Sequence, residues 1–278
     1  MTGARPTAPS LALRHPPHGL RELPWGEPLE GWHASAAPLV ELNVGPSRHL
    51  VRFVAVADEV YAVKQLPRRL AVHEDAVLVR LGATVLPCVR PGGYVLLPGD
   101  DALLVTRYLT DSWQLRAALA RVGAEHRHAL LGLMLDLLVE AHGIGLLWGD
   151  CSLANTLLRR DGRQLRAYLV DVETSELQDR LTDGQREQDV GIAVENTAGA
   201  LLDLAAAAGR GRDTEALLRE AVALGDRYDR RWQGRTALAK HRSAGQDGAI
   251  RTGGMTARAT QALVALGPDL ARLTPGGR

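Results

Sequence analysis

Hydrophobic positions in the first part of the chain follow the short period of β-strands, with one helical exception. Residues 38–66 are rich in valine and are interrupted by turn signals such as Asp58-Glu59, which predicts an antiparallel meander. Residues 68–82 instead carry hydrophobic residues at helical spacing and end at a glycine, so we expect a helix there. Residues 84–109 predict further strands, broken by Pro-Gly-Gly and Gly-Asp-Asp turns.

After residue 110 the pattern changes to helical periodicity. Two short segments, NTLLRR and RAYLVD, interrupt it and predict strands joined by a hairpin at Asp161-Gly162. The predicted helices cover residues 112–122, 125–144, 185–208 and 212–232.

This change of pattern predicts an α+β chain with two lobes. We expect a small antiparallel β lobe with one helix over residues 21–109 and a larger, mostly helical lobe over residues 110–233. Residues 1–20 contain four prolines and are expected to form a loose arm. Residues 234–278 are rich in Gly, Arg, Thr and Ala, with at most one weak helix at 256–266, and predict a poorly ordered or divergent tail.

Charge and composition exclude several classes of protein. The formal net charge of +1 gives no general reason to expect nucleic acid or an acidic membrane as partner. The most apolar segment, residues 129–148, has the length of a membrane span but contains Asp136, Glu140 and His142, so we expect a buried helix and no membrane span. The two cysteines form no metal-binding or disulfide pattern, which favours the cytoplasm.

Lysine is rare in this chain, and one of its two lysines stands where chemistry is plausible. Lys64 ends the strand segment VYAVK, from which its ammonium could reach nucleotide phosphates. Glu74, on the helix that follows, could pair with Lys64 and hold it in place. The neighbouring Asp75 is the alternative partner, since the hydrophobic stripe of Val72, Ala76, Val79 and Leu81 does not fix the orientation of the helix.

Three polar residues farther along have the types and spacing of a phosphotransfer site. Asp150 and Asn155 lie five positions apart between two apolar segments, and Asp171 closes the strand AYLVD. An Asp-x-x-x-x-Asn loop can place Asp150 beside an attacking hydroxyl, and Asn155 and Asp171 offer oxygen ligands to Mg²⁺. Each residue alone is an ordinary turn or strand-end residue, but together they satisfy type, order and spacing.

The order of these residues resembles that of the protein-kinase-like fold. The segments WGDCSLANTLLRRDG, AYLVDVETSEL and DGQREQDV resemble, more closely, a family of proteins from high-GC bacteria that is lipopolysaccharide kinase-like and similar to the heptose and Kdo kinases. The resemblance covers residues 20–232. It implies Asp150 as catalytic residue, Lys64 and Glu74 as ATP-binding residues, and Asn155 and Asp171 as Mg²⁺ ligands. Asp189, on the following helix, would bond the loop backbone or else be a surface acid.

Several positions depart from the usual kinase pattern. Trp148 stands where most kinases have histidine, and Asp-Val-Glu replaces Asp-Phe-Gly, so that Glu173 could be a third metal ligand or merely exposed. A single glycine, Gly45, precedes Lys64 at the expected phosphate-binding hairpin. Asp189 comes only 18 positions after Asp171, too few for the activation segment and peptide platform of a protein kinase.

The function predicted from the sequence is therefore an ATP- and Mg²⁺-dependent phosphotransferase acting on a hydroxyl of a small molecule, sugar or glycolipid. The alternative is a pseudokinase, a nucleotide-binding or scaffold module with little turnover and a protein partner, which Trp148 and the reduced glycine loop favour. Phosphotransfer of the aminoglycoside type uses the same fold but would require an acidic substrate pocket.

Overall fold

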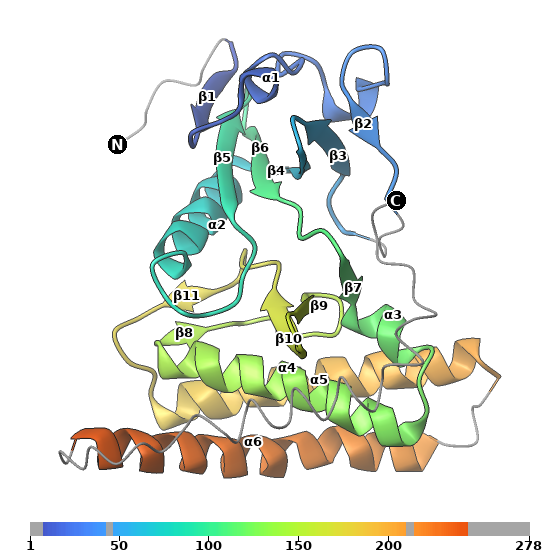
Figure 1. The fold of residues 1–278 in the computed structure, drawn as a ribbon, viewed down its shortest axis with the longest axis vertical. Helices are drawn as coiled ribbons and strands as arrows, with labels where there is room; N and C mark the ends of the chain where they lie inside the picture. Colours follow the sequence, from blue (N-terminus) through green and yellow to red (C-terminus); the bar gives the residue numbers. More distant parts are fainter. Residues whose placement is uncertain (1–7, 43–46, 210–213, 244–278) are drawn as a thin grey trace. The chain divides into compact units, whose positions relative to one another are not determined.

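The computed structural model describes the backbone of residues 8–42, 47–209 and 214–243, and these residues form an α+β structure (Figure 1). The chain divides into two compact units. The first comprises the residues up to Asp111 together with Asp171–Glu173, and the second comprises Ser112–Val170 and the described residues from Thr174 onward.

A six-stranded sheet forms the framework of the first unit, in the order β1-β5-β6-β4-β3-β2, and every neighbouring pair is antiparallel. The meander predicted over residues 38–66 is confirmed. The sequence predicted a turn at Pro-Gly-Gly, and this prediction is wrong. The segment instead begins β5, with a register shift between Pro91 and Gly93. The strands are β1 Ser10–Leu13, β2 Leu39–Val40, β3 Val51–Val56, β4 Glu59–Pro67, β5 Pro91–Leu96 and β6 Asp101–Arg107.

The N-terminal segment is more structured than its prolines suggested. Residues 10–13 form the edge strand β1, which pairs with β5, and α1 (His18–Arg21) follows directly after Pro17. A short 3-10 helix, η1, covers Leu29–Gly31. The expectation of a loose arm over residues 1–20 is therefore wrong for the described part of the segment, because residues 10–13 pair with β5 and Leu20, only 1% exposed, packs into the core with the partly buried Leu13.

The helix predicted over residues 68–82 is confirmed as α2 (Arg68–Leu81). Its buried face differs from the expected stripe, because Val72 and Val79 are exposed. Of that stripe Leu81 is fully buried, Leu78 is buried beside it, and Glu74 and Asp75 are buried with them. Two carboxylates thus occupy the inner face of this helix, where each needs a charged or hydrogen-bonding partner.

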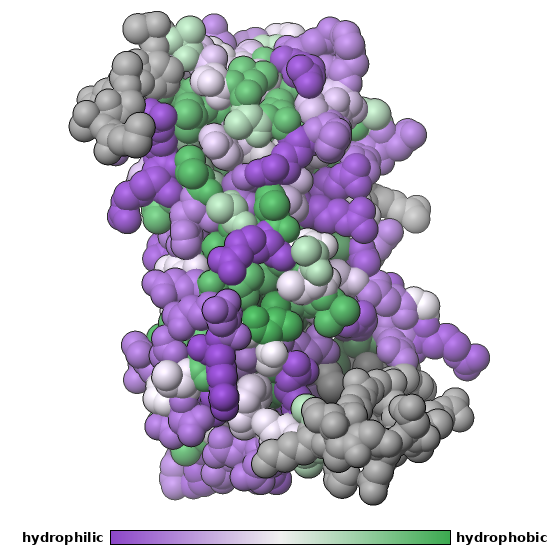
Figure 2. All heavy atoms as spheres, turned by 90° about the vertical axis from the view of Figure 1, so that its left-hand side faces the viewer, coloured by the Kyte–Doolittle hydropathy of each residue, from purple (hydrophilic) through white to green (hydrophobic). Residues whose placement is uncertain are grey.

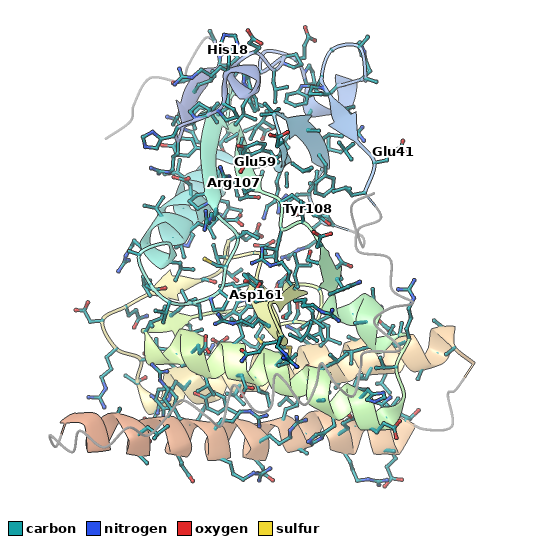
Figure 3. All side chains as sticks on the ribbon, in the orientation of Figure 1. His18, Glu41, Glu59, Arg107, Tyr108 and Asp161 are labelled. Carbon is teal, nitrogen blue, oxygen red and sulfur yellow. The ribbon has the colours of Figure 1, made fainter. Side chains whose placement is uncertain are left out.

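An ion pair closes one end of the central strands of the sheet. Arg107 at the end of β6 lies 2.7 Å from Glu59 at the start of β4, and Tyr61 donates a hydrogen bond to the same carboxylate (Figure 3). The register places Tyr61 opposite Arg107 and Lys64 opposite Leu104, so the strand that carries Lys64 is held on both sides by β3 and β6.

The second unit is mostly helical, as predicted. The strands of NTLLRR and RAYLVD pair as an antiparallel hairpin, which is also confirmed. The segment 112–122 begins with a strand rather than a helix, because residues 112–114 pair with the hairpin. The elements are β7 Ser112–Gln114, α3 Leu115–Leu119, α4 Ala124–Gly143, β8 Leu146–Leu147, β9 Thr156–Asp161, β10 Gln164–Leu169, β11 Glu176–Leu177, α5 Asp183–Ala207 and α6 Thr214–Ser243.

The last described helix is longer than predicted. It continues to Ser243, whereas the sequence suggested an end near residue 232 and a poorly ordered stretch after it. The weak helix expected at 256–266 lies outside the described residues. The boundary at residue 234 therefore does not mark the end of the helix.

The two most apolar helices differ in burial. Residues in the middle of α4 are almost all buried, as expected for a core helix. A much smaller share of α5 is buried. By length and composition alone, α5 is the one helix in the described ranges that is apolar enough to cross a membrane. It also carries the polar residue Asp189, which is fully buried within the unit. On the face drawn in Figure 2, hydrophobic residues lie scattered among hydrophilic ones.

Candidate functional site

The first unit gathers charged side chains around Lys64. Its ammonium nitrogen lies 2.9 Å from Glu74 Oε2 and 3.1 Å from Asp171 Oδ2, donating a hydrogen bond to each. A third carboxylate, that of Glu173, lies 3.3 Å away. The structure thus brings together Lys64, Glu74 and Asp171, and the choice between Glu74 and Asp75 is decided because Asp75 accepts a hydrogen bond from Arg14 at 3.2 Å.

Secondary structure explains why this cluster forms. Alternation along β4 buries Tyr61 and Val63 on one face and turns Lys64 to the other. The side chain of Glu74 extends from α2 to meet it, and Glu74 Oε1 also lies 3.5 Å from the backbone nitrogen of Val172. The helix and the Asp-Val-Glu segment therefore meet at one carboxylate.

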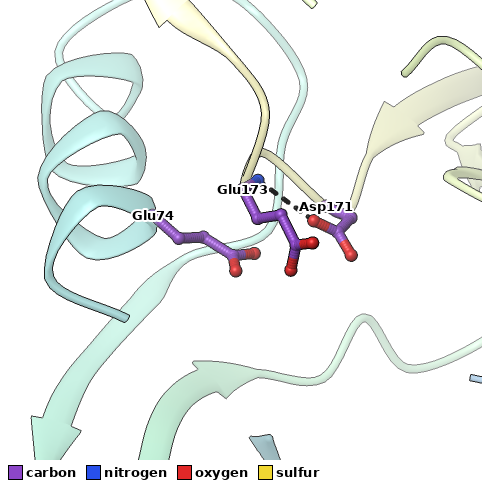
Figure 4. Close-up of side chains that lie close together, drawn as sticks. All are labelled: Glu74, Asp171 and Glu173. Atoms are coloured by element: carbon purple, nitrogen blue, oxygen red, sulfur yellow. Dashed lines mark hydrogen bonds between the residues drawn. The ribbon is translucent and has the colours of Figure 1, made fainter. Parts of the chain in front are cut away.

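Three carboxylates of this cluster converge closely enough to hold a metal ion. One oxygen each from Glu74, Asp171 and Glu173 lies within 4.8 Å of the others (Figure 4). The backbone nitrogen of Glu173 donates to Asp171 Oδ1 at 3.1 Å, which fixes the turn between them. An all-oxygen set of this kind suits a hard divalent cation such as Mg²⁺.

Glu173 is buried in a way that agrees with such a role. Its side chain is only 10% exposed, and its Oε2 is buried without a hydrogen bond among the described residues. Three nitrogen-bearing side chains lie close to it: Lys64 Nζ is 3.3 Å and His49 Nε2 is 3.1 Å from Oε2, and Arg48 is 3.6 Å from Oε1. The sequence left two hypotheses for Glu173, a metal ligand or an exposed acid. The hypothesis of an exposed acid is wrong.

The electrostatics of the cluster follow from burial and crowding. Burial raises the pKa of Glu74 to about 7, and the neighbouring charge of Asp171 adds to the rise, while Lys64 opposes it. Burial alone would lower the pKa of Lys64, but attraction to Glu74 and Asp171 outweighs it and raises that pKa. Lys64 therefore stays protonated near neutral pH, while Glu74 is poised to gain or lose a proton.

The second unit holds the loop that carries Asp150. Asn155 donates from its side-chain nitrogen to Asp150 Oδ2 at 3.0 Å and to the backbone oxygen of Asp150 at 3.1 Å. Asn196 of α5 donates to Asp150 Oδ1 at 3.0 Å and to the backbone oxygen of Cys151 at 3.1 Å. The structure thus brings Asp150 and Asn155 together, and Asn196 with them.

A buried aspartate fixes the backbone just before Asp150. Asp189 accepts hydrogen bonds from the backbone nitrogens of Trp148 at 2.7 Å and Gly149 at 2.8 Å, so the hypothesis that Asp189 bonds the loop backbone is confirmed. Gly149 has a φ of +78°, and a Cβ there would approach the backbone oxygen of Thr174 to 2.7 Å, so only glycine suits the position.

Asp189 belongs to a chain of buried polar contacts. His142 Nε2 lies 3.0 Å from Asp189 Oδ2, and His142 Nδ1 lies 2.6 Å from the hydroxyl of Tyr228 on α6. Trp148, two positions before Asp150, is fully buried and its indole nitrogen has no hydrogen-bond partner among the described residues. Its backbone oxygen accepts from the Ser175 hydroxyl at 2.8 Å.

The predicted metal pair is divided between the units, because Asn155 belongs to the second unit and Asp171 to the first. Joint ligation of one ion by these two residues stays a prediction. Sequence reasoning missed the contacts of His49 and Asn196. The signal for Asn196 was available, since the chain has only three asparagines and this one lies on a helix seven positions after Asp189.

Comparisons with known proteins give a distant structural likeness. No model of a known protein family matches the chain, and no curated protein matches it. Among solved structures, the chain is similar to WaaP in complex with acyl carrier protein, with 17% sequence identity, over 75% of this chain and 92% of that chain, at a TM-score of 0.43.

Proposed function

We propose that this chain is a kinase-like phosphotransferase that uses ATP with Mg²⁺ and acts in the cytoplasm on a hydroxyl of a small molecule, sugar or glycolipid. The observation that carries the proposal is the cluster around Lys64. A rare lysine that is kept protonated, paired with a buried glutamate of the adjacent helix and set beside two further carboxylates, has the parts that phosphate and metal recognition require.

In this proposal the residues of the first unit bind the phosphates and the metal. Lys64 is held by Glu74 at 2.9 Å, so its ammonium is oriented before a nucleotide arrives. Asp171 and Glu173 supply carboxylate oxygens, and the convergence of one oxygen each from Glu74, Asp171 and Glu173 within 4.8 Å supports a fit to a cation. When bound, Mg²⁺ would neutralise charge on the phosphates.

The residues of the second unit act on the acceptor. Asp150 accepts the proton of the attacking hydroxyl, or orients that hydroxyl by a hydrogen bond. Asn155 holds one oxygen of this carboxylate, and Asp189 holds the backbone leading to it. The short interval between Asp171 and Asp189 favours a small acceptor over a protein.

A pseudokinase is the second candidate, and a specific observation favours it. The Lys64 ammonium itself lies among the three carboxylates and balances part of their charge without any cation. A cluster of this kind can be stable as a purely structural ion-pair network. The buried indole nitrogen of Trp148 is a further departure from an optimised catalytic loop.

Thermal unfolding of the full chain with and without ATP and Mg²⁺ tests the proposal. A ligand that binds the native state raises the unfolding midpoint by mass action. We expect a rise with ATP plus Mg²⁺ that is much smaller with ATP plus EDTA. Lys64→Ala and Asp171→Ala should remove the rise, and Lys240→Ala is the matched control because it removes the only other lysine.

Release of ADP then separates the two candidate functions. A metal-dependent rise accompanied by slow ADP release, lost in Asp150→Ala, supports the phosphotransferase. A rise without ADP release in the presence of candidate acceptor alcohols favours the pseudokinase. No rise at millimolar ATP, or an equal rise in Lys64→Ala, would contradict nucleotide binding at this cluster.

A further inference from the structure

Both oxygens of the Asp150 carboxylate are held by side-chain amides of the second unit. Asn155, five positions later in the same loop, donates to Oδ2 at 3.0 Å. Asn196 donates to Oδ1 at 3.0 Å, although it lies 46 positions away on α5. The first contact belongs to the loop motif itself, whereas the second depends on how the helix packs against the loop.

The Asn196 amide nitrogen joins the carboxylate to the backbone next to it. It donates to Asp150 Oδ1 at 3.0 Å and to the backbone oxygen of Cys151 at 3.1 Å. An amide nitrogen carries two hydrogens, so one can point at each oxygen. This arrangement restricts rotation of the Asp150 side chain relative to its own backbone.

Helix α5 presents this amide from the same face as Asp189. Positions seven apart in an α-helix differ by only about 20° in direction, so Asp189 and Asn196 point the same way, two turns apart. Asp189 binds the backbone nitrogens of Trp148 and Gly149, while Asn196 binds Asp150 and Cys151. Four consecutive loop residues are therefore bonded to two side chains of one helix.

From these contacts we infer that Asn196 is a positioning residue for Asp150, fixing the direction from which its carboxylate meets the acceptor hydroxyl. The inference rests on the proposed phosphotransferase function and adds to it a residue outside the motifs of the catalytic loop. Asn196 touches neither nucleotide nor acceptor in this inference, and it acts only through Asp150.

The chemistry of the amide explains why this residue type suits the position. An amide donates hydrogen bonds without placing a positive charge beside the carboxylate that is to accept a proton. Each carboxylate oxygen has two lone pairs, and an amide bond uses only one of them. A lysine or arginine at position 196 would hold the carboxylate but oppose its protonation.

Hydrolysis of ATP to ADP and phosphate by the full chain, with water as the acceptor, saturating Mg²⁺ and varied ATP, tests the inference. Asn196→Ala should lower kcat on the order of 10- to 100-fold and leave the KM for ATP unchanged, because only the orientation of Asp150 is lost. Asn196→Asp, which is nearly the same size, should lower kcat further, since it places a second negative charge against Asp150. Glu195→Ala, an exposed neighbour on α5, is the matched control.

A double-mutant cycle distinguishes positioning from a structural role. In an Asp150→Ala background, Asn196→Ala should cause no further fall in kcat, because the group that it orients is already gone. Selective ¹⁵N labelling of the three asparagines gives a readout that does not depend on turnover. Asp150→Ala should move the side-chain amide signal of Asn196, which is assigned by its disappearance in Asn196→Ala.

The outcomes separate the inference from the function on which it rests. Additive losses in the cycle, an unchanged kcat in Asn196→Ala, or an unmoved Asn196 signal would each overturn the inference while leaving phosphotransfer intact. A wild-type chain that releases no ADP, but whose Asn196 signal moves in Asp150→Ala, would overturn the proposed function and the positioning role with it.

Discussion

The clusters around Lys64 and Asp150 stabilise partly buried charges by different interactions, ion pairs in the first and neutral hydrogen-bond donors in the second. Around Lys64, the ammonium and the Arg48 guanidinium face three carboxylates, so formal charges meet directly and do not balance. Around Asp150, the carboxylate meets neutral amides, and Asp189 nearby meets backbone N–H groups. The first arrangement is the one to which the proposed function assigns a further cation, while the second fixes orientation and adds no charge.

The difference suggests a division of labour that each unit carries in its own chemistry. An unbalanced ionic cluster responds to pH and to divalent ions. A network of amides and backbone groups responds mainly to the loss of geometry. Mutations should therefore affect binding and pH dependence in the first unit, and stability and kcat in the second.

The largest expected effect is in the neutral network. Asp189→Ala should lower the free energy of unfolding by about 4 kcal/mol, because it leaves the backbone nitrogens of Trp148 and Gly149 buried without their acceptor and removes a partner of His142. Urea unfolding measures it, with the exposed Glu187→Ala on the same helix as control. A loss below about 1 kcal/mol would show that water or other groups replace the aspartate.

The next effect belongs to the ionic cluster and depends on pH. The pKa of Glu74 rises from 4.5 to about 7 on folding, so the folded state binds more protons than the unfolded state between these values. The contribution of Glu74 to the free energy of unfolding is fully present below pH 4.5 and is lost as the pH rises through 7. The loss amounts to about 3 kcal/mol. In Glu74→Gln, the free energy of unfolding should lack this pH-dependent contribution. Urea unfolding measured in EDTA between pH 4.5 and pH 7 compares the two proteins. Parallel pH curves for the two proteins would refute the assignment.

A smaller effect tests whether the Lys64 ammonium competes with cations. Lys64→Met removes the positive charge and keeps the length of the side chain. It should strengthen Mn²⁺ binding in the absence of nucleotide on the order of tenfold, measured by titration calorimetry. Lys240→Met should leave the affinity unchanged. Weaker binding in Lys64→Met would mean that the carboxylates do not form a cation site.

The smallest effect returns to the neutral network. Tyr228→Phe removes the hydroxyl that lies 2.6 Å from His142 Nδ1 but keeps the edge-to-face ring contact. The loss of one buried hydrogen bond should lower stability by about 1 kcal/mol, with little difference between low and high salt. A strong dependence on salt would mean that this contact is ionic, and the contrast between the two clusters would weaken.

Local patterns in the sequence predicted the regular elements well and the long-range pairings poorly. The helix from Arg68 and the hairpin at Asp161-Gly162 have strong periodic signals of their own. Strand β1 was missed because four residues between prolines give no such signal, and only pairing with β5 makes them a strand. At Gly92 and Gly93, a Cβ would collide with Val105 and Ala12, so these glycines permit close approach of neighbouring strands rather than a turn.

For the candidate site, too, local sequence patterns predicted single residues well and long-range contacts poorly. Motif spacing brought out Lys64, Glu74, Asp150, Asn155 and Asp171, because their types and order are unusual together. No local pattern could link Asn196 to Asp150 or His49 to Glu173, since these contacts join segments far apart in the sequence. They exist only because packing brings a helix to a loop and the residues before a strand to a turn.

Strand β1 also has a consequence for the solubility of the protein. It covers the outer edge of β5, and without it the N–H and C=O groups of that strand would be open to pairing with another chain. Removal of the residues before Arg14 would therefore promote edge-to-edge aggregation even if the remaining sheet still folded. With β1 in place the edge of the sheet is a strand of four residues instead of the six of β5, and a shorter edge offers less backbone for self-association.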